Sequence, residues 1–140
     1  MDLYEQAIKY LTMREHSRFE LEQKLLKKTE NKDEVTCVLD KLEKEKFLSD
    51  ERFCESYLRS RIRKNVEGKQ ILKMRLKAKG VSSQLATEMT EKFFEENSEM
   101  IAVAVSKKYQ KILSQKGEEK ARLMLYQKGL MDIELDIDER

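Results

Sequence analysis

Apolar positions recur along the chain with the three- and four-residue spacing of amphipathic helices, and their pattern repeats about every fifty residues. The clearest unit is a block of 13 residues that occurs three times. In each block, a residue that can cap a helix is followed by apolar positions four residues apart, and the block ends in Lys-Thr or Lys-Gly. The three blocks are residues 17–29, 68–80 and 117–129.

Each block predicts a short helix, and periodic apolar residues on both sides of it predict two more. The expected helices lie near residues 2–15, 18–28, 33–46, 50–66, 69–79, 83–97, 99–115, 118–128 and 132–138. Three short helices bury little surface alone, so neighbouring repeats should pack on one another. We therefore expect an all-α protein of three tandem three-helix repeats, 1–48, 49–97 and 98–140, stacked into an elongated, curved, solenoid-like rod.

Residues at the expected helix ends support this division. Gly80 and Gly129 close the second and third blocks, where a helix commonly ends in the left-handed conformation that glycine tolerates, and we assign both a structural role. Serine and glycine are common at the N-cap position, where the first helical turn begins. The expected N-caps are Ser17, Ser49, Gly68, Ser82, Ser98 and Gly117.

Composition narrows the classes of function. The chain has no run of about 18 apolar residues, and its first residues lack the features of a signal peptide, so we expect a cytoplasmic protein that does not span a membrane. Because no nucleophile with a base, metal-ligand set or phosphate-binding glycine loop is evident, we expect neither an enzyme nor a cofactor. His16 should cap or pack, and Cys37 and Cys54 should be buried, reduced thiols.

The net charge of +2 conceals an asymmetry along the chain. Residues 1–55 carry 11 basic and 14 acidic side chains, residues 56–80 carry 9 and 1, and residues 81–140 carry 9 and 12, which gives −3, +8 and −3. The middle repeat is therefore the cationic one.

A stripe of lysines follows the helix expected at residues 69–79. Lys69, Lys73 and Lys77 are four residues apart and share one face. Like charges at this spacing destabilise a helix by roughly a few tenths of a kcal/mol each, and this segment contains no acidic residue to offset them. Helix stability therefore does not explain the stripe. Either a lysine-rich chain carries it incidentally, or it binds an anionic partner, which is the interpretation we favour.

The preceding helix presents a second basic face. Arg52, Arg59 and Arg63 project away from its apolar side, and Lys64 follows them. Arg61 instead projects toward the apolar side, so we expect it to be structural, with its stem packed and its head group paired. Such cations bind a phosphate backbone without reading its sequence, and an acidic protein groove would suit them equally well. The candidate binding residues are Arg52, Arg59, Arg63, Lys64, Lys69, Lys73 and Lys77.

Acidic and aliphatic residues alternate over residues 132–139. One interpretation is a solvating cap on the third repeat. The other is an autoinhibitory tail that competes with anionic partners for the basic repeat.

Several of these residues form motifs that resemble those of the RecX family. The first signature comprises Tyr10-Leu11, Arg14-Glu15-His16-Ser17, Glu20-Leu21 and Lys24-Leu25, and the second comprises Leu48-Ser49-Asp50-Glu51-Arg52-Phe53, Tyr57 and Ser60-Arg61, followed by Leu76 and Lys79-Gly80-Val81. Thr29 departs from the pattern, because the family more often has glycine there. The third repeat is also less basic than in many relatives.

The resemblance implies a monomer that lies along the deep groove of a RecA–DNA filament, bridges its protomers and limits recombinase and coprotease activity. RecA is thus the implied partner, and single- or double-stranded DNA should bind weakly, without sequence specificity. An alternative is a helix-turn-helix transcription regulator, which would need a dimer and base-reading side chains at the start of a recognition helix. A third is a helical adaptor that ignores nucleic acid and binds its partner independently of salt.

The lysine stripe generates a prediction about stability. Changing Lys69, Lys73 and Lys77 together to Gln keeps helix propensity nearly constant and removes like-charge repulsion. The sequence therefore predicts that thermal unfolding of the triple variant is unchanged or slightly raised, while its inhibition of strand exchange by RecA is weakened.

Overall fold

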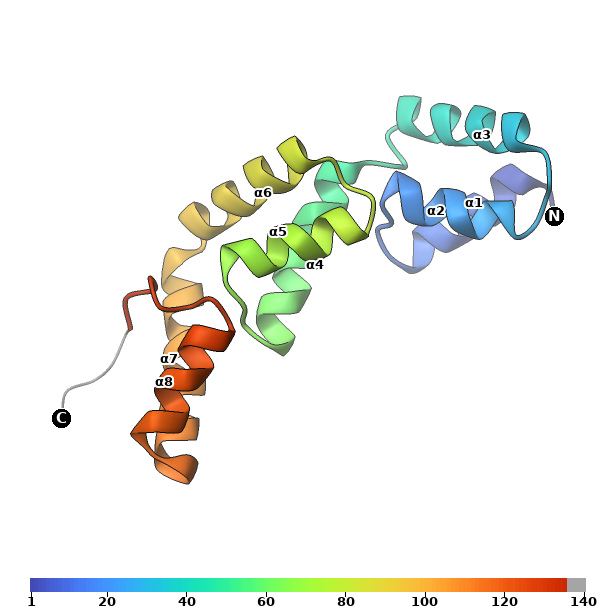
Figure 1. Ribbon diagram of the computed structural model, residues 1–140. Coiled ribbons are helices and arrows are strands. Elements are labelled where there is room, and N and C mark those ends of the chain that lie inside the picture. Colours follow the sequence, from blue (N-terminus) through green and yellow to red (C-terminus); the bar gives the residue numbers. More distant parts are fainter. Residues whose placement is uncertain (136–140) are drawn as a thin grey trace.

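The structure is a computed structural model that describes residues 1–135 of the chain. These residues contain eight α-helices (Figure 1). They are α1 (Leu3–Met13), α2 (Arg18–Leu26), α3 (Lys32–Lys44), α4 (Asp50–Lys64), α5 (Lys69–Ala78), α6 (Ser83–Glu96), α7 (Ser98–Lys116) and α8 (Glu118–Gln127). Strands are absent from these 135 residues, and the predicted all-α class is confirmed.

Capping side chains explain where most of the helices begin. Ser17 and Glu20 form a capping box, in which the Ser17 Oγ accepts from the Glu20 N–H at 3.1 Å and the Glu20 carboxylate accepts from the Ser17 N–H at 3.2 Å. Ser49 and Ser82 cap α4 and α6, as expected. The expected cap at Ser98 is wrong, because the preceding asparagine occupies the N-cap position of α7 and Ser98 is its first helical residue.

The helices follow the predicted repeats as far as the end of α8. Helices α1–α3 and α4–α6 form two three-helix units, and α7 and α8 follow them. The ninth helix, expected near 132–138, does not form in its described part. Residues 131–133 make a turn and residues 134–135 have no regular structure, while residues 136–138 lie outside the described residues.

The spacing of aliphatic residues gives a reason for this difference. Ile133 and Leu135 both pack against the core. Side chains two residues apart lie on one side of an extended chain, whereas on a helix they point in different directions. The alternation of acidic and aliphatic residues therefore opposes a helix over residues 132–135, where a turn and an irregular segment bring both aliphatic side chains to the core.

Two separate apolar cores stabilise the arc of helices in Figure 1. One lies within α1–α3, around the fully buried Leu21, Leu25 and Leu39. The other is shared by the second and third repeats, with Leu58 and Ile101 among its fully buried members. Apolar stacking thus joins the second and third repeats, while the first keeps a core of its own. The repeat boundaries at residues 48 and 97 stay predictions.

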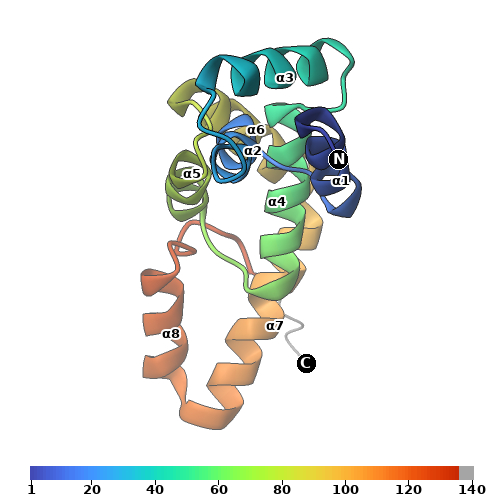
Figure 2. The same cartoon turned by 90° about the vertical axis from the view of Figure 1, so that its right-hand side faces the viewer.

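Equivalent residues join successive repeats. The Ser17 Oγ donates to the carbonyl oxygen of Lys79 at 2.6 Å, and the Gly68 N–H donates to the carbonyl oxygen of Lys128 at 2.7 Å. Ser17 and Gly68 precede the middle helices α2 and α5, whereas Lys79 and Lys128 end the middle helices α5 and α8. The start of each middle helix thus binds the end of the next. Figure 2 shows the result, with α5 and α8 on one side of the arc and α4 and α7 on the other.

Close backbone approach at these junctions explains the glycines. A methyl group at Gly68 would overlap the carbonyl oxygen of Gly129, and a methyl group at Gly80 would overlap the side chain of Phe19. Gly80 and Gly129 also have φ angles of 88° and 67°, the left-handed conformation expected from the sequence.

Replacing Gly68 with Ala should lower the free energy of unfolding by about 1–3 kcal/mol, because the added methyl group would force the junction between α5 and α8 apart. Urea denaturation followed by circular dichroism measures this loss. Gln70→Ala, at an exposed position in the first turn of α5, is the matched control and should change stability by less than about 0.5 kcal/mol. Equal stability of the two variants would contradict the tight junction.

Candidate functional site

The seven basic residues proposed from the sequence do not form one surface. Arg52 lies at the junction between the first two repeats, where its Nε donates to a carboxylate oxygen of Glu15 at 3.2 Å. At the same junction, the Arg18 N–H donates to the Asp50 carboxylate at 2.8 Å. Arg52 therefore helps to hold the first repeat against the second.

Lys69 and Lys73 both bind Glu91 of α6. Their Nζ atoms lie 2.9 Å and 2.8 Å from its two carboxylate oxygens, and the side chain of Lys73 is only 11% exposed. The hydrogen bonds from Lys73 and Lys69 hold the pKa of Glu91 below its ordinary value. Glu91 lies on the helix packed beside the lysine-bearing one, so the periodicity of the lysine-bearing helix alone does not reveal this counter-charge.

This pairing replaces the sequence-based expectation for the triple Gln variant. Changing Lys69 and Lys73 would leave Glu91 without its two cations, so the variant is now expected to lose stability. The loss should be small, roughly 0.2–1 kcal/mol per pair, because the Glu91 side chain is 47% exposed. Lys77, the third member of the stripe, is exposed on α5.

Arg59, Arg63 and Lys64 lie together at the end of α4, where they line a groove against α7. The groove has a volume of about 620 Å³, and Figure 2 shows the end of α4 beside α7. Its α7 wall contributes three lysines that the sequence analysis did not propose. Among the described residues, six basic side chains and no acidic one line this cationic groove: Arg59, Arg63, Lys64, Lys107, Lys108 and Lys111.

Helical spacing brings the three α7 lysines together. Lys107, Lys108 and Lys111 are one, three and four residues apart, so they lie on one face of α7. Met100 and Val103 continue that face toward the helix start and line the same groove. The sequence does contain a signal for this basic face, because like charges recur at helical spacing. The net charge of −3 over residues 81–140 concealed it.

The groove keeps an excess of positive charge. Burial lowers the pKa of Lys108, and the charge of Lys128 lowers it further. The Lys108 Nζ also donates to the Oδ1 of Asn65, which fixes α7 to the linker after α4. Arg59 has partial compensation from Glu55, 3.6 Å away. Because six of the described lining residues are basic and none is acidic, the groove is suited to a negatively charged partner.

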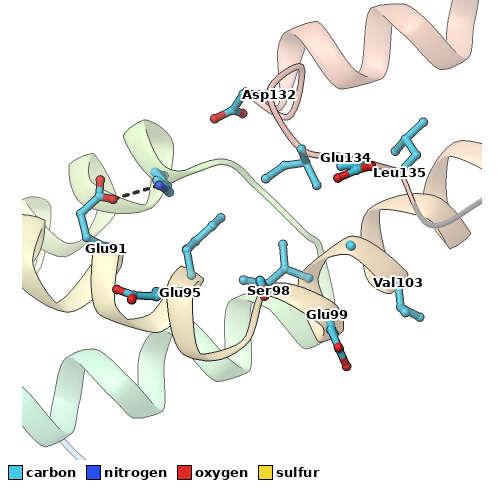
Figure 3. A pocket seen from close by; sticks show the side chains of 13 residues that line it. Glu91, Glu95, Ser98, Glu99, Val103, Asp132, Glu134 and Leu135 are labelled. Carbon is cyan, nitrogen blue, oxygen red and sulfur yellow. Dashed lines mark hydrogen bonds and ion pairs between the residues drawn. The ribbon is translucent and has the colours of Figure 1, made fainter.

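A second groove, of about 820 Å³, adjoins the cationic groove at Val103 of α7, which lines both, and carries the opposite charge. Figure 3 shows Glu91, Glu95 and Glu99 on its α6–α7 side, and Asp132 and Glu134 on the segment that follows α8. The dashed line there marks the Lys69–Glu91 ion pair. Because its only basic lining residue among those described is already paired, this groove would repel an anionic partner.

The linker between α4 and α5 holds the cationic groove in place through Glu67. This carboxylate is 1% exposed and accepts hydrogen bonds from Arg61 at 2.8 Å and from Arg75 at 2.9 and 2.7 Å. Burial by itself would raise the pKa of Glu67, but the hydrogen bonds from Arg75 and Arg61 outweigh it and hold the pKa below its ordinary value of 4.5. Arg61 thus has a paired head group, which agrees with the structural role expected for it.

The histidine and the cysteines lie away from both grooves. His16 is 1% exposed; its Nδ1 lies 3.1 Å from the Arg14 carbonyl oxygen and its Nε2 lies 2.7 Å from the Lys24 Nζ. It therefore packs at the turn between α1 and α2, as expected. Cys54 is buried, and burial raises the pKa of its thiol to about 12. The expectation of a buried Cys37 is wrong, because Cys37 lies on the exposed side of α3.

Within residues 1–135, no helix is both long and apolar enough to cross a bilayer. In that same range, no three His, Cys, Asp or Glu side chains are grouped so that they could hold a metal ion. The fold and the site define a helical-repeat protein with a cationic groove between α4 and α7.

Comparison with known proteins identifies the family. Residues 4–42 match the family model described as "RecX, first three-helix domain", and residues 49–89 match that described as "RecX, second three-helix domain". "Regulatory protein RecX" of Oceanobacillus iheyensis is 31% identical over 130 residues, which cover 90% of this chain and 48% of the relative. Its counterpart in Chlorobium limicola is 37% identical over 87 residues, which cover 62% of this chain and 55% of the relative.

A solved structure agrees in fold. The crystal structure of RecX from Lactobacillus salivarius matches with a TM-score of 0.73 at 21% identity, over 90% of this chain and 84% of that one. The chain belongs to the RecX family, whose members are named regulatory proteins. It spans about half the length of the curated relatives described above. Neither family-model match extends beyond residue 89, so α7 and its lysines lie outside both matches.

Glu67→Gln should lower the free energy of unfolding at neutral pH by about 1–3 kcal/mol, because two arginines lose their buried counter-charge. Since the folded pKa of Glu67 is depressed, its contribution is present above the ordinary value of 4.5 and is lost as pH falls through the folded pKa. The difference between parent and variant should therefore shrink below about pH 4.5. Urea denaturation across this pH range measures it.

Glu96→Gln, at an exposed position of α6, is the control and should change stability by less than about 0.5 kcal/mol at any of these pH values. A stability difference between parent and Glu67→Gln that stayed constant with pH would show that the charge of Glu67 does not stabilise the linker.

Proposed function

We propose that this chain regulates recombination and DNA repair by binding the deep groove of the RecA–DNA filament and limiting the recombinase and coprotease activities of RecA. Its membership of the RecX family supports a regulatory role. The observation that carries the proposal is the cationic groove, in which α4 and α7 bring six basic side chains together without an acidic one among the described lining residues.

Electrostatics favours such a complex. A nucleoprotein filament is a polyanion, and basic side chains that contact it release counterions and gain affinity without base-specific contacts. The described lining residues of the groove include six basic side chains and no acidic one. A surface whose charges are all positive attracts an anionic partner during its approach and raises the rate of association.

The shape of the molecule supports an extended contact. Successive repeats form an arc in which the first repeat has its own core and the second and third share another (Figure 1). An arc of this kind presents its side chains over a longer span than a sphere of the same size. It can therefore contact more than one protomer of a filament.

The structure revises the residues proposed for binding. We retain Arg59, Arg63 and Lys64 and add Lys107, Lys108 and Lys111. Arg52, Lys69 and Lys73 are occupied by Glu15 and Glu91 and belong to the scaffold. The exposed Lys77 is an accessory contact on α5.

Three further properties belong to this proposal. The chain acts as a monomer, because a filament groove needs no two-fold symmetric partner. It binds single- or double-stranded DNA weakly and without sequence preference, since its cations contact phosphates and not base edges. It acts in the cytoplasm, where RecA filaments form.

Changing Lys107 and Lys111 together to Gln should weaken association with RecA–DNA filaments about tenfold and reduce the slope of log affinity against log salt by about two, one for each lost cation. It should also restore strand exchange by RecA in the presence of the protein. Fluorescence anisotropy of labelled filaments across a salt series measures the first effect, and a strand-exchange assay at matched salt measures the second.

Lys116→Gln with Lys120→Gln is the matched control, because it removes the same charge at exposed positions outside the groove. It should keep nearly the parent affinity. If both double variants lost the same affinity, net charge and not the groove would determine binding. Strong preference for one duplex sequence would instead support the helix-turn-helix regulator.

A further inference from the structure

The cationic groove has an apolar floor that a phosphate backbone would leave unused. Met100 and Val103 of α7 line it and are 39% and 40% exposed. Ile62 and Val66 close its base from α4 and the linker and are themselves buried. Exposed apolar side chains inside a groove favour a partner with apolar groups of its own.

Nucleic acid bases could supply apolar surface, but the described residues that line this groove include no aromatic side chain on which bases could stack. Proteins bind single strands largely by stacking bases on aromatic side chains. No Phe, Tyr, Trp or His occurs among the described residues that line the cationic groove. The bases of a duplex are stacked inside the helix, so duplex DNA would offer the floor even less apolar surface.

Apolar and basic positions are arranged in order along the groove. Met100 and Val103 occupy the first half of α7, and Lys107 and Lys111 occupy the second half of the same face. Arg63 faces the groove from the end of α4. A ligand that fills it must therefore carry apolar and acidic groups close together, which is a property of peptides and not of a phosphate backbone.

The chain itself shows how such a segment binds beside α7. In the neighbouring groove, Ile133 and Leu135 pack against the core, while Asp132 and Glu134 stay exposed (Figure 3). A non-helical segment with alternating acidic and aliphatic residues thus packs against the core beside this helix. In that groove the acids face other acids, whereas in the cationic groove they would face lysines and arginines.

We propose that the cationic groove between α4 and α7 binds a segment of a partner protein in which acidic residues alternate with aliphatic ones. The aliphatic side chains cover Met100 and Val103, and the carboxylates pair with Lys107, Lys111 and Arg63. This inference rests on the proposed function, because it names a further component of the RecA–DNA filament that the groove contacts, an acidic protein segment in addition to the phosphates.

The test compares three probes on the folded full-length chain by fluorescence anisotropy. The first is an octapeptide in which Glu alternates with Leu, the second has Ser in place of each Leu, and the third is a short oligothymidylate. The Leu peptide should bind at least about tenfold more tightly than the Ser peptide, because the two differ only in the apolar surface they can bury.

Two double variants separate the contribution of the apolar floor to binding from that of the basic side chains. Met100→Gln with Val103→Thr, both at exposed positions, should weaken the Leu peptide about tenfold and leave oligothymidylate binding unchanged. Lys107→Gln with Lys111→Gln should weaken the Leu peptide and RecA–DNA filament association alike. Circular dichroism and thermal unfolding confirm that each variant is folded, and Lys116→Gln with Lys120→Gln is again the control.

The outcomes separate this inference from the proposed function. Equal affinity for the Leu and Ser peptides, or no binding of either, overturns the inference. If the charge variant loses filament association while the floor variant keeps it, the groove contacts phosphates, so the proposed function stands and the inference fails. If the floor variant loses peptide binding but both variants keep filament association, the peptide site stands and the proposed function fails.

Discussion

A backbone carbonyl at the end of one middle helix accepts a hydrogen bond from the start of the middle helix before it, and this contact sets the spacing of the repeats. It occurs between Ser17 and Lys79 and again between Gly68 and Lys128. Because donor and acceptor belong to helix ends, the two helices must approach end to end, and side chains there would collide. Glycine at position 68 removes that collision. The arc in Figure 1 follows from repeating this contact.

The cationic groove depends on the second of these junctions. Residues 65–68 connect α4 to α5, and each end of this linker contacts the third repeat, through Lys108 at Asn65 and through the end of α8 at Gly68. Between these contacts, the carboxylate of Glu67 pairs with both Arg61 and Arg75. The same linker thus stabilises the junction and fixes the end of α4 against α7. A change that loosens it should disturb stability and binding together.

The fold places the basic side chains in two different surroundings, which the net charge of the chain does not reveal. Lys69 and Lys73 neutralise Glu91, whereas the lysines of α7 join the basic end of α4 in a groove without acids among its described lining residues. An acidic groove adjoins this groove at Val103 of α7 (Figure 3). Opposite potentials in two adjoining grooves would orient an anionic partner, because one groove attracts it and the other repels it.

The sequence by itself determined the eight helices of the described residues, most of their caps and the left-handed glycines, because these depend on residues within a few positions of one another, although it placed the cap of α7 at Ser98 and not at the residue before it. It misjudged residues 132–135, where two local periods compete, and the exposure of Cys37. Only the tertiary structure decided which cations are paired and which line a groove. Glu91 meets Lys73, and Lys107 joins Arg63, only when separate helices pack, and a distance across helices cannot be obtained from the periodicity of either one.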